Sequence, residues 1–281
     1  MVQKPMTTDL PILERMSWNA ASPDERQAVA RTIAKRLPDS FIFDGLETHS
    51  LGDQSHEIAF FHFEKAKFAL VPGCSAAVLG YDRDRPFVLN PEQREDWLLT
   101  EEEYGISLHQ YLDRYLTRLR TVQIQPLLVE VDACSVVYAQ DGNDQTEGYT
   151  QVLSQLENGF RLLKPDEWEY VCSAGTRSLF RWGNDCPVSN SYEEKTWNQH
   201  KQPNAFGLRF NSSTYESELC QGPSLRGGDG GSSVCGGMGN VASWLPLASS
   251  FRVPDDEIEG WYIDDVLVRR VCSIFSQLSI G

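Results

Sequence analysis

Three observations predict that the chain adopts an α+β fold with little regular secondary structure. Apolar residues recur at helical spacing in two segments, 22–37 and 100–119. Strand-like runs stand between these segments, at 58–63 and 68–71. From Asn184 onward the chain is rich in Gly, Ser, Pro and Asn and has no clear periodicity. Helices and strands in separate runs are typical of the α+β class.

Residues 1–40 are predicted to form an N-terminal helical extension. Ser22-Pro23-Asp24-Glu25 combines an N-cap residue, a proline suited to the first turn and early acidic residues. Val29, Ile33 and Leu37 follow at four-residue spacing, which places them on one face. The segment therefore indicates one amphipathic helix.

Residues 41–281 are predicted to form one domain. Residues 82–103 are charged and contain proline, so we expect a surface loop there. The 3.6-residue period that follows predicts a second amphipathic helix over about 100–119. Residues 120–131 alternate and then become continuously apolar, which indicates a strand, whereas 141–148 are polar and disorder-leaning.

A turn, a short strand and a helix are predicted around residue 165. Asn158-Gly159 is a turn dipeptide, and 160–163 are apolar enough for a buried strand. Lys164-Pro165-Asp166-Glu167 then opens a helix, because proline suits its first position and acidic residues favour its positive end. Trp168 begins an apolar helix face, and we expect it in the core.

Three ordered motifs are similar to those of a known family. They are the run Arg161-Leu162-Leu163-Lys164-Pro165-Asp166-Glu167-Trp168-Glu169-Tyr170, then Trp182-Gly183-Asn184, then Asn204-Ala205-Phe206-Gly207-Leu208. Together they resemble the signature of the formylglycine-generating enzyme (sulfatase-modifying factor) superfamily. The resemblance covers roughly 220 residues and implies an elaborated C-type-lectin-like fold, in which a core is wrapped by irregular chain.

The catalytic motif of that family is only half present. In catalytic members an R-G-G-S segment leads into C-x4-C, whose two thiols hold copper, a metal that soft sulfur ligands select as Cu(I). The segment from Gly230 to Cys235 can be laid on the first half, but the position five residues further is Asn240. Alignment on Arg226 instead requires three inserted residues before Cys235. The resemblance therefore implies a diverged member without the second copper ligand.

The glycine-rich segment around Cys235 is nevertheless the candidate site. Its glycines should leave the thiol exposed, with backbone N–H groups that favour the thiolate; the alternative is an inert loop cysteine. Arg226 and Asp229 are candidate ligand-binding residues or a structural pair that shapes the loop, and Asn240 is a further candidate. Three aromatic residues could line a nearby cleft or belong to the core: Trp244, Trp261 and Tyr262.

The charge composition of the chain limits the classes of partner that it can bind. The 40 acidic residues outnumber the 25 basic ones, for a net charge of −15, so nucleic acid is not expected as a partner. The acidic excess serves solubility or favours a cationic ligand or metal ion. The family resemblance leaves open whether calcium is held by Asp, Asn and backbone oxygens, as in some relatives. No apolar run is long enough to span a membrane, and the first 13 residues do not resemble a signal peptide, which predicts a cytoplasmic protein.

Cysteines and histidines carry little further signal. The seven cysteines include no C-x-x-C pair, and their odd number predicts reduced thiols without a disulfide. Cys134, Cys172 and Cys272 are expected to behave as small buried hydrophobes. His56 and His62 share one face of a predicted strand, which indicates either a solvated sheet face or a metal pair.

Two functions follow as hypotheses. The first is a binding module that holds a peptide or small molecule at the glycine-rich loop and is not a sulfatase-maturing oxidase. The second is an oxygen- or thiol-dependent oxidoreductase that uses Cys235 as nucleophile or copper ligand on a cysteine-containing substrate. Cys220 is the nearest cysteine in sequence that could complete its site.

Overall fold

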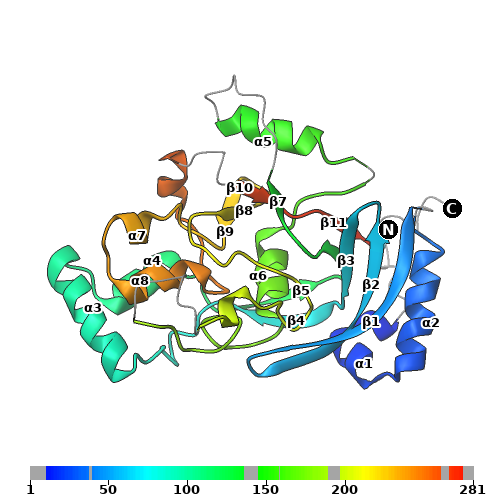
Figure 1. The fold of residues 1–281 in the computed structure, drawn as a ribbon, viewed down its shortest axis with the longest axis horizontal. Helices are drawn as coiled ribbons and strands as arrows, with labels where there is room; N and C mark the ends of the chain where they lie inside the picture. Colours follow the sequence, from blue (N-terminus) through cyan, green and yellow to red (C-terminus); the bar gives the residue numbers. More distant parts are fainter. Residues whose placement is uncertain are drawn as a thin grey trace, which may run out of the picture.

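The protein has a mixed α+β fold built mainly from antiparallel strands (Figure 1). The computed structural model describes these residues: 11–37, 40–135, 145–157, 159–188, 197–260 and 266–274. Within these ranges no helix is both long and apolar enough to cross a membrane.

The largest sheet has five strands in the order β1-β2-β3-β6-β11, and all its neighbours are antiparallel. The strands are β1 (Phe41–Leu51), β2 (Gln54–Phe63), β3 (Ala66–Val71), β6 (Leu127–Glu130) and β11 (Val271–Ser273). Along β2, Ile58 and Phe60 belong to one core cluster, and Ala59 and Phe61 belong to another. The sheet is therefore buried on both faces, which explains why its runs are continuously apolar.

Two helices cover one face of this sheet, α1 (Arg15–Ala20) and α2 (Pro23–Ala34) (Figure 1). Ser22 and Glu25 form the predicted capping box at the start of α2. Trp18 of α1 is buried, and its Nε1 donates to the Glu57 carbonyl at 2.7 Å. The predicted helix is confirmed, but the segment contains this additional short helix as well.

The remaining strands form two smaller sheets. One pairs β4 (Cys74–Leu79) with β5 (Arg120–Ile124). The other has the order β7-β10-β8-β9, built from β7 (Cys134–Ser135), β10 (Val266–Val268), β8 (Ser217–Cys220) and β9 (Ser224–Arg226). In it, β8 and β10 are parallel. The strand predicted over 120–131 is thus two strands, β5 and β6, in different sheets.

The prediction of a surface loop over 82–103 is wrong for the second half of that range, which forms helix α3 (Pro91–Tyr104). Asn90 and Gln93 form a capping box, and Gly105 ends the helix with a φ of 64°. The helix predicted over 100–119 is shorter, α4 (Leu108–Tyr115), with its own capping box at Ser107. A glycine C-cap therefore separates two helices where one continuous period was expected.

Helix α5 (Gln145–Ser154) occupies part of the segment that was predicted to be disorder-leaning. Residues 141–144 of that prediction lie outside the described residues, whereas 145–148 begin the helix. Val152 of α5 is buried with Leu162 and Val268 in a small apolar cluster. This packing gives the polar segment a reason to be helical.

The predicted helix after Lys164 is confirmed as α6 (Pro165–Ser173). Glu167 accepts from the Lys164 backbone N–H at 2.9 Å and binds both terminal nitrogens of the Arg161 guanidinium. Trp168 is 2% exposed, so its core assignment is confirmed. The strand predicted over 160–163 is not confirmed, because only Arg161 pairs there, in a single backbone bridge with Val271.

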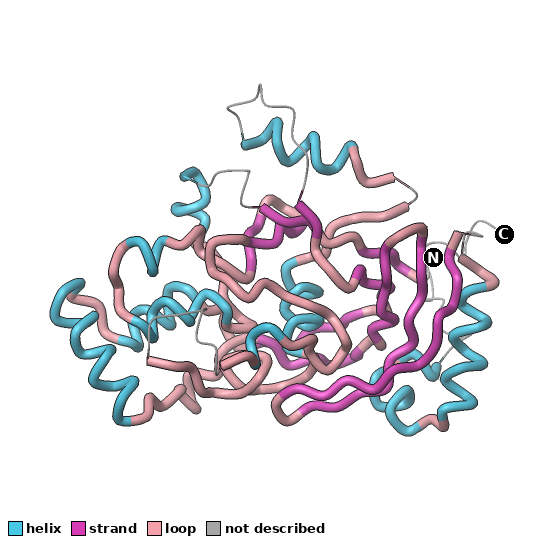
Figure 2. Tube along the Cα trace, in the orientation of Figure 1, coloured by secondary structure: helices cyan, strands magenta, loops and turns pink. Residues whose placement is uncertain are grey.

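Long irregular segments follow α6, as predicted (Figure 2). Between α6 and β8 the described residues contain one regular element, the 3-10 turn η2 (Gln199–Lys201). The Asn204 side chain organises part of it, because its Nδ2 donates to the Val171 and Cys172 carbonyls while its Oδ1 accepts from the Phe206 and Leu208 N–H groups. One asparagine thus joins this loop to the end of α6.

The remaining elements are short. They are η1 (Pro11–Leu13), α7 (Ser232–Cys235), α8 (Asn240–Trp244), η3 (Leu245–Leu247) and η4 (Asp255–Gly260). Helices α7 and α8 carry the glycine-rich candidate site, and α3 packs against α8 (Figure 1).

Candidate functional site

A buried ion pair fixes the sheet from which the glycine-rich segment emerges. Glu218 of β8 and Arg269 after β10 are each 1% exposed and lie 2.5 Å apart. Trp168 Nε1 also donates to Glu218 at 2.9 Å, and Arg269 Nη1 donates to the Glu130 and Val131 carbonyls. Because every charge here is paired and hydrogen-bonded, the frame is rigid and specific in geometry.

The first half of the glycine-rich segment is interior. Arg226 ends β9 and is buried, and its Nη1 donates to the Phe251 carbonyl at 3.2 Å. Burial lowers the pKa of its guanidinium. A Cβ at Gly228 would lie 2.0 Å from the Glu216 carbonyl oxygen, so only glycine fits against that backbone.

Asp229 shapes the loop, but not through Arg226. One carboxylate oxygen accepts from the Gly231 N–H at 3.0 Å, and the other accepts from the Ser233 N–H at 2.9 Å and hydroxyl at 2.5 Å. Its burial raises the pKa of the carboxyl group, and these hydrogen bonds oppose that effect. The expected Arg226–Asp229 pair is therefore wrong: Arg226 donates to the Phe251 carbonyl, whereas Asp229 accepts from Gly231 and Ser233.

Cys235 ends α7 and is exposed, as the sequence predicts. Its Sγ lies 3.5 Å from the Tyr215 hydroxyl, and this hydrogen bond raises the pKa of Tyr215. Four of the amides expected to be free are already hydrogen-bonded. The N–H groups of residues 235–238 donate to the carbonyls of Gly231, Ser232, Val234 and Ser233. These four N–H groups are therefore not free to stabilise a thiolate.

Asn240, a predicted ligand-binding residue, is bound by Asp96 of α3. Its backbone N–H and Nδ2 donate to one oxygen of Asp96, at 3.2 and 2.7 Å. The other Asp96 oxygen accepts from the Val241 N–H at 2.8 Å. Asp96 of α3 thus caps the N-terminal end of α8, and Asn240 serves this helix contact.

Trp244 belongs to the core and not to an open cleft. It is 1% exposed, and its ring lies edge-on to those of Trp182 and His200. The other two aromatic candidates, Trp261 and Tyr262, lie outside the described residues. Of the predicted ligand-binding residues, Arg226, Asp229 and Trp244 are thus buried, and the exposed surface is made by other groups.

Two tyrosines that the sequence analysis missed contact the Cys235-Gly236 segment. Tyr104 of α3 is 40% exposed and donates to the Gly236 carbonyl; Tyr215 is 41% exposed. A Cβ at Gly231 would lie 2.4 Å from the Tyr215 ring, so this glycine makes room for the ring. We call Tyr104, Tyr215 and residues 235–237 the thiol surface. Neither tyrosine stands in a recognisable motif.

The other thiols are poorly placed to complete a copper site. Cys220 is fully buried in β8, where desolvation raises the pKa of its thiol. Burial likewise raises the pKa of Cys172 to about 12 and of Cys272 to about 11. Cys134 was expected to be buried but is exposed, because β7 lies at the edge of its sheet. All seven cysteines are free.

The described residues contain no group of three or more His, Cys, Asp or Glu side chains that could hold a metal ion. His56 and His62 share a sheet face but serve different partners. His56 is buried against the Ala174 carbonyl at 3.1 Å, whereas His62 lies 3.1 Å from Asp44. The residues around Cys235 therefore do not fit a two-thiolate copper centre.

Comparison with protein-family models and with curated proteins returns no match for this chain.

Proposed function

We propose that this protein is a ligand-binding module on a formylglycine-generating-enzyme-like scaffold. It holds a peptide or a small molecule at the thiol surface and is not itself a sulfatase-maturing oxidase. The proposal is carried by the contact between Asn240 and Asp96. Asn240 stands at the position where the family has its second thiol, and its side chain binds Asp96. The seven free thiols support a reducing, cytoplasmic setting.

The thiol surface has features of a recognition surface. Exposed tyrosines offer large, rigid contact area at low entropic cost, and two of them flank side-chain-free Gly236 and Gly237. The loop beneath them is held by Asp229, and α8 is held by Asp96. Because the surface is pre-organised, a ligand orders few groups on binding.

The experiment is a screen of short random peptides and of small fragments against the full chain, followed by matched variants. Tyr104→Ala and Tyr215→Ala should each weaken selected ligands by about tenfold or more, as anchor tyrosines do. Cys134→Ser, at the other exposed thiol, should leave affinity unchanged. Selected ligands that bind both tyrosine variants as tightly as the wild type, or screens without any enrichment, would contradict the proposal.

An oxidoreductase that uses Cys235 is the second candidate, favoured by one observation. The thiol is exposed and lies 3.5 Å from a tyrosine hydroxyl. Anaerobic loading with Cu(I), followed by dialysis against a competing chelator, separates the two functions. Copper retained by the wild type and by Cys134→Ser but lost from Cys235→Ser would favour the oxidoreductase.

A further inference from the structure

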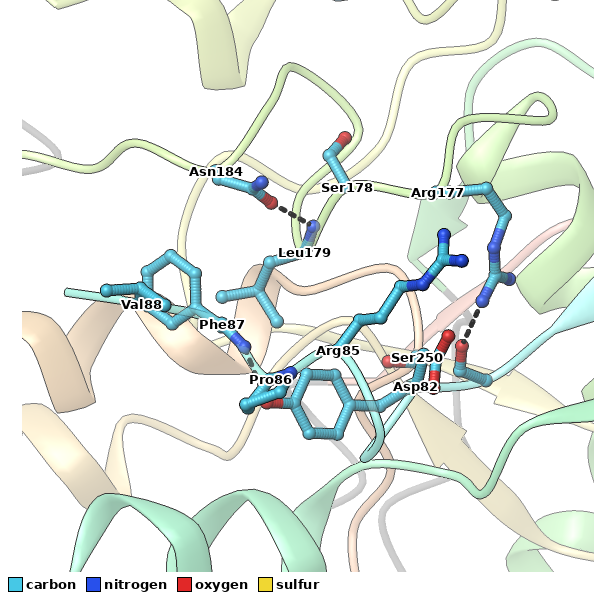
Figure 3. A pocket seen from close by; sticks show the side chains of 12 residues that line it. Asp82, Arg85, Pro86, Phe87, Val88, Arg177, Ser178, Leu179, Asn184 and Ser250 are labelled. Carbon is cyan, nitrogen blue, oxygen red and sulfur yellow. Dashed lines mark hydrogen bonds between the residues drawn. The ribbon is translucent and has the colours of Figure 1, made fainter.

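A surface pocket away from the thiol surface has an unusual combination of charges. It has a volume of about 270 Å³ and lies between the loop that carries Asp82, Arg85 and Phe87 and the segment that carries Arg177, Leu179 and Asn184 (Figure 3). Figure 3 shows the Arg85 side chain extending toward the segment with Arg177 and Ser178. The two arginines are 92 positions apart in sequence and meet only through the fold.

Neither guanidinium group forms an ion pair within the described part of the chain. Arg177 donates to the carbonyls of Val78 at 2.8 Å and Gly80 at 3.2 Å, which hold it in place without carrying opposite charge. Arg85 forms no ion pair within 4.0 Å among the described residues. Two cations that share a pocket repel each other, so an anion placed between them would be stabilised.

The lining also includes the Asn184 amide and an apolar wall. Asn184 Oδ1 accepts from the Leu179 N–H at 2.7 Å, which orients the amide so that its Nδ2 remains a donor. Leu179 and Phe87 are the apolar wall (Figure 3). The Phe87 N–H donates to the Tyr81 hydroxyl at 2.8 Å, which ties the loop to a buried residue.

We propose that this pocket binds a carboxylate group that carries a small apolar substituent. Arg85 and Arg177 would hold the carboxylate, and Leu179 and Phe87 would contact the substituent. Two guanidinium groups and the Asp82 carboxylate leave one positive charge in the lining, which matches a monoanion better than a phosphate dianion. The volume is below the range of drug-sized sites, so the ligand is small.

The carboxylate could come from a free organic acid or from the C-terminal residue of a peptide. Both sources present the same planar group, which guanidinium binds in two-point fashion. The pocket and the thiol surface share no residue, so this inference stands whether or not the proposed function holds.

The test compares acids with their amides on the full chain. N-acetyl-leucine and benzoate are titrated by NMR up to about 10 mM, a range that detects millimolar dissociation constants. N-acetyl-leucinamide and benzamide are the uncharged controls. We expect both acids to bind at least about tenfold more tightly than their amides, because the amides lack the charge that arginine recognises. A free and an amidated Ala-Ala-Ala-Leu peptide then distinguish the two sources.

Arg85→Ala is the principal variant, since this side chain is exposed and its loss should leave the fold intact. Arg94→Ala, at an exposed arginine of α3, makes the same charge change elsewhere. Acid binding should fall about tenfold in Arg85→Ala and stay unchanged in Arg94→Ala. Acids and amides that bind equally, no acid binding in the titrated range, or equal loss in both variants would overturn the inference.

Discussion

Replacing Trp168 with alanine should destabilise the protein by about 3–5 kcal/mol, the cost found for truncating core aromatic residues. The structure gives three reasons for a value in this range. The side chain is 2% exposed, its ring lies edge-on to Phe210 at 5.5 Å, and its Nε1 donates to Glu218. A Cβ at Gly227 would lie 2.9 Å from the same ring, so the ring also supports the start of the glycine-rich segment.

The assay is urea denaturation followed by far-UV circular dichroism. Trp168→Phe keeps an aromatic ring but loses the hydrogen bond to Glu218, so its cost should be smaller, about 1–3 kcal/mol. Tyr215→Ala removes an exposed aromatic residue and should stay within about 0.5 kcal/mol of the wild type. A loss below about 1 kcal/mol in Trp168→Ala would refute the reasoning, because no fully packed tryptophan is so cheaply removed.

Three further predictions concern the loop and a buried histidine. Brief iodoacetamide treatment of the folded protein, read by mass spectrometry, should label Cys235 and Cys134 before the five buried thiols; an unlabelled Cys235 would contradict its exposure. Asp229→Ala should lower the free energy of unfolding by about 1–3 kcal/mol, because it leaves buried donors unpaired, and melting curves check this. Burial lowers the pKa of His56, so the folded state favours the neutral imidazole ring. The stability that this neutral ring contributes to the folded protein is present above pH 6.5 and is lost as the pH falls below that value. His56→Gln should flatten the stability profile between pH 7 and 5, and an unchanged slope would show that another group titrates there.

Local signals in the sequence predicted the elements that they control, and these predictions were confirmed. Helix α6 follows from Pro165 and its acidic neighbours, and α2 follows from the Ser22 capping box. Helix α3 was missed because its buried face holds polar residues, Gln93 and Thr100, beside Trp97. A search for apolar periodicity does not register such a face, although the capping residues at its start were visible.

The candidate site was predictable only where it depends on neighbours in sequence. The exposure of Cys235 follows from its glycine-rich context, and the absence of a second thiol was read directly at Asn240. The tyrosines beside Cys235 come from positions 104 and 215, and nothing local marks them. The hydrogen bonding of the N–H groups of residues 235–238 was also unpredictable, because the four residues after Gly231 form a helical turn that Asp229 holds. Tertiary contacts decide both features.

The short segment 266–273 joins parts of the molecule that are far apart in sequence, and this sets the order in which the protein can fold. Its strands pair with β6, β7 and β8, and Val271 also bridges Arg161. Most of these partners precede it by more than 100 residues, and long-range pairing of this kind slows folding. During synthesis, Glu218 therefore has no Arg269 partner until the chain has been extended by about another 50 residues. Until then, Glu218 cannot be buried with its counter-ion and the edges of β6 and β8 stay open, so newly made chains should depend on protection from aggregation more than the finished protein does.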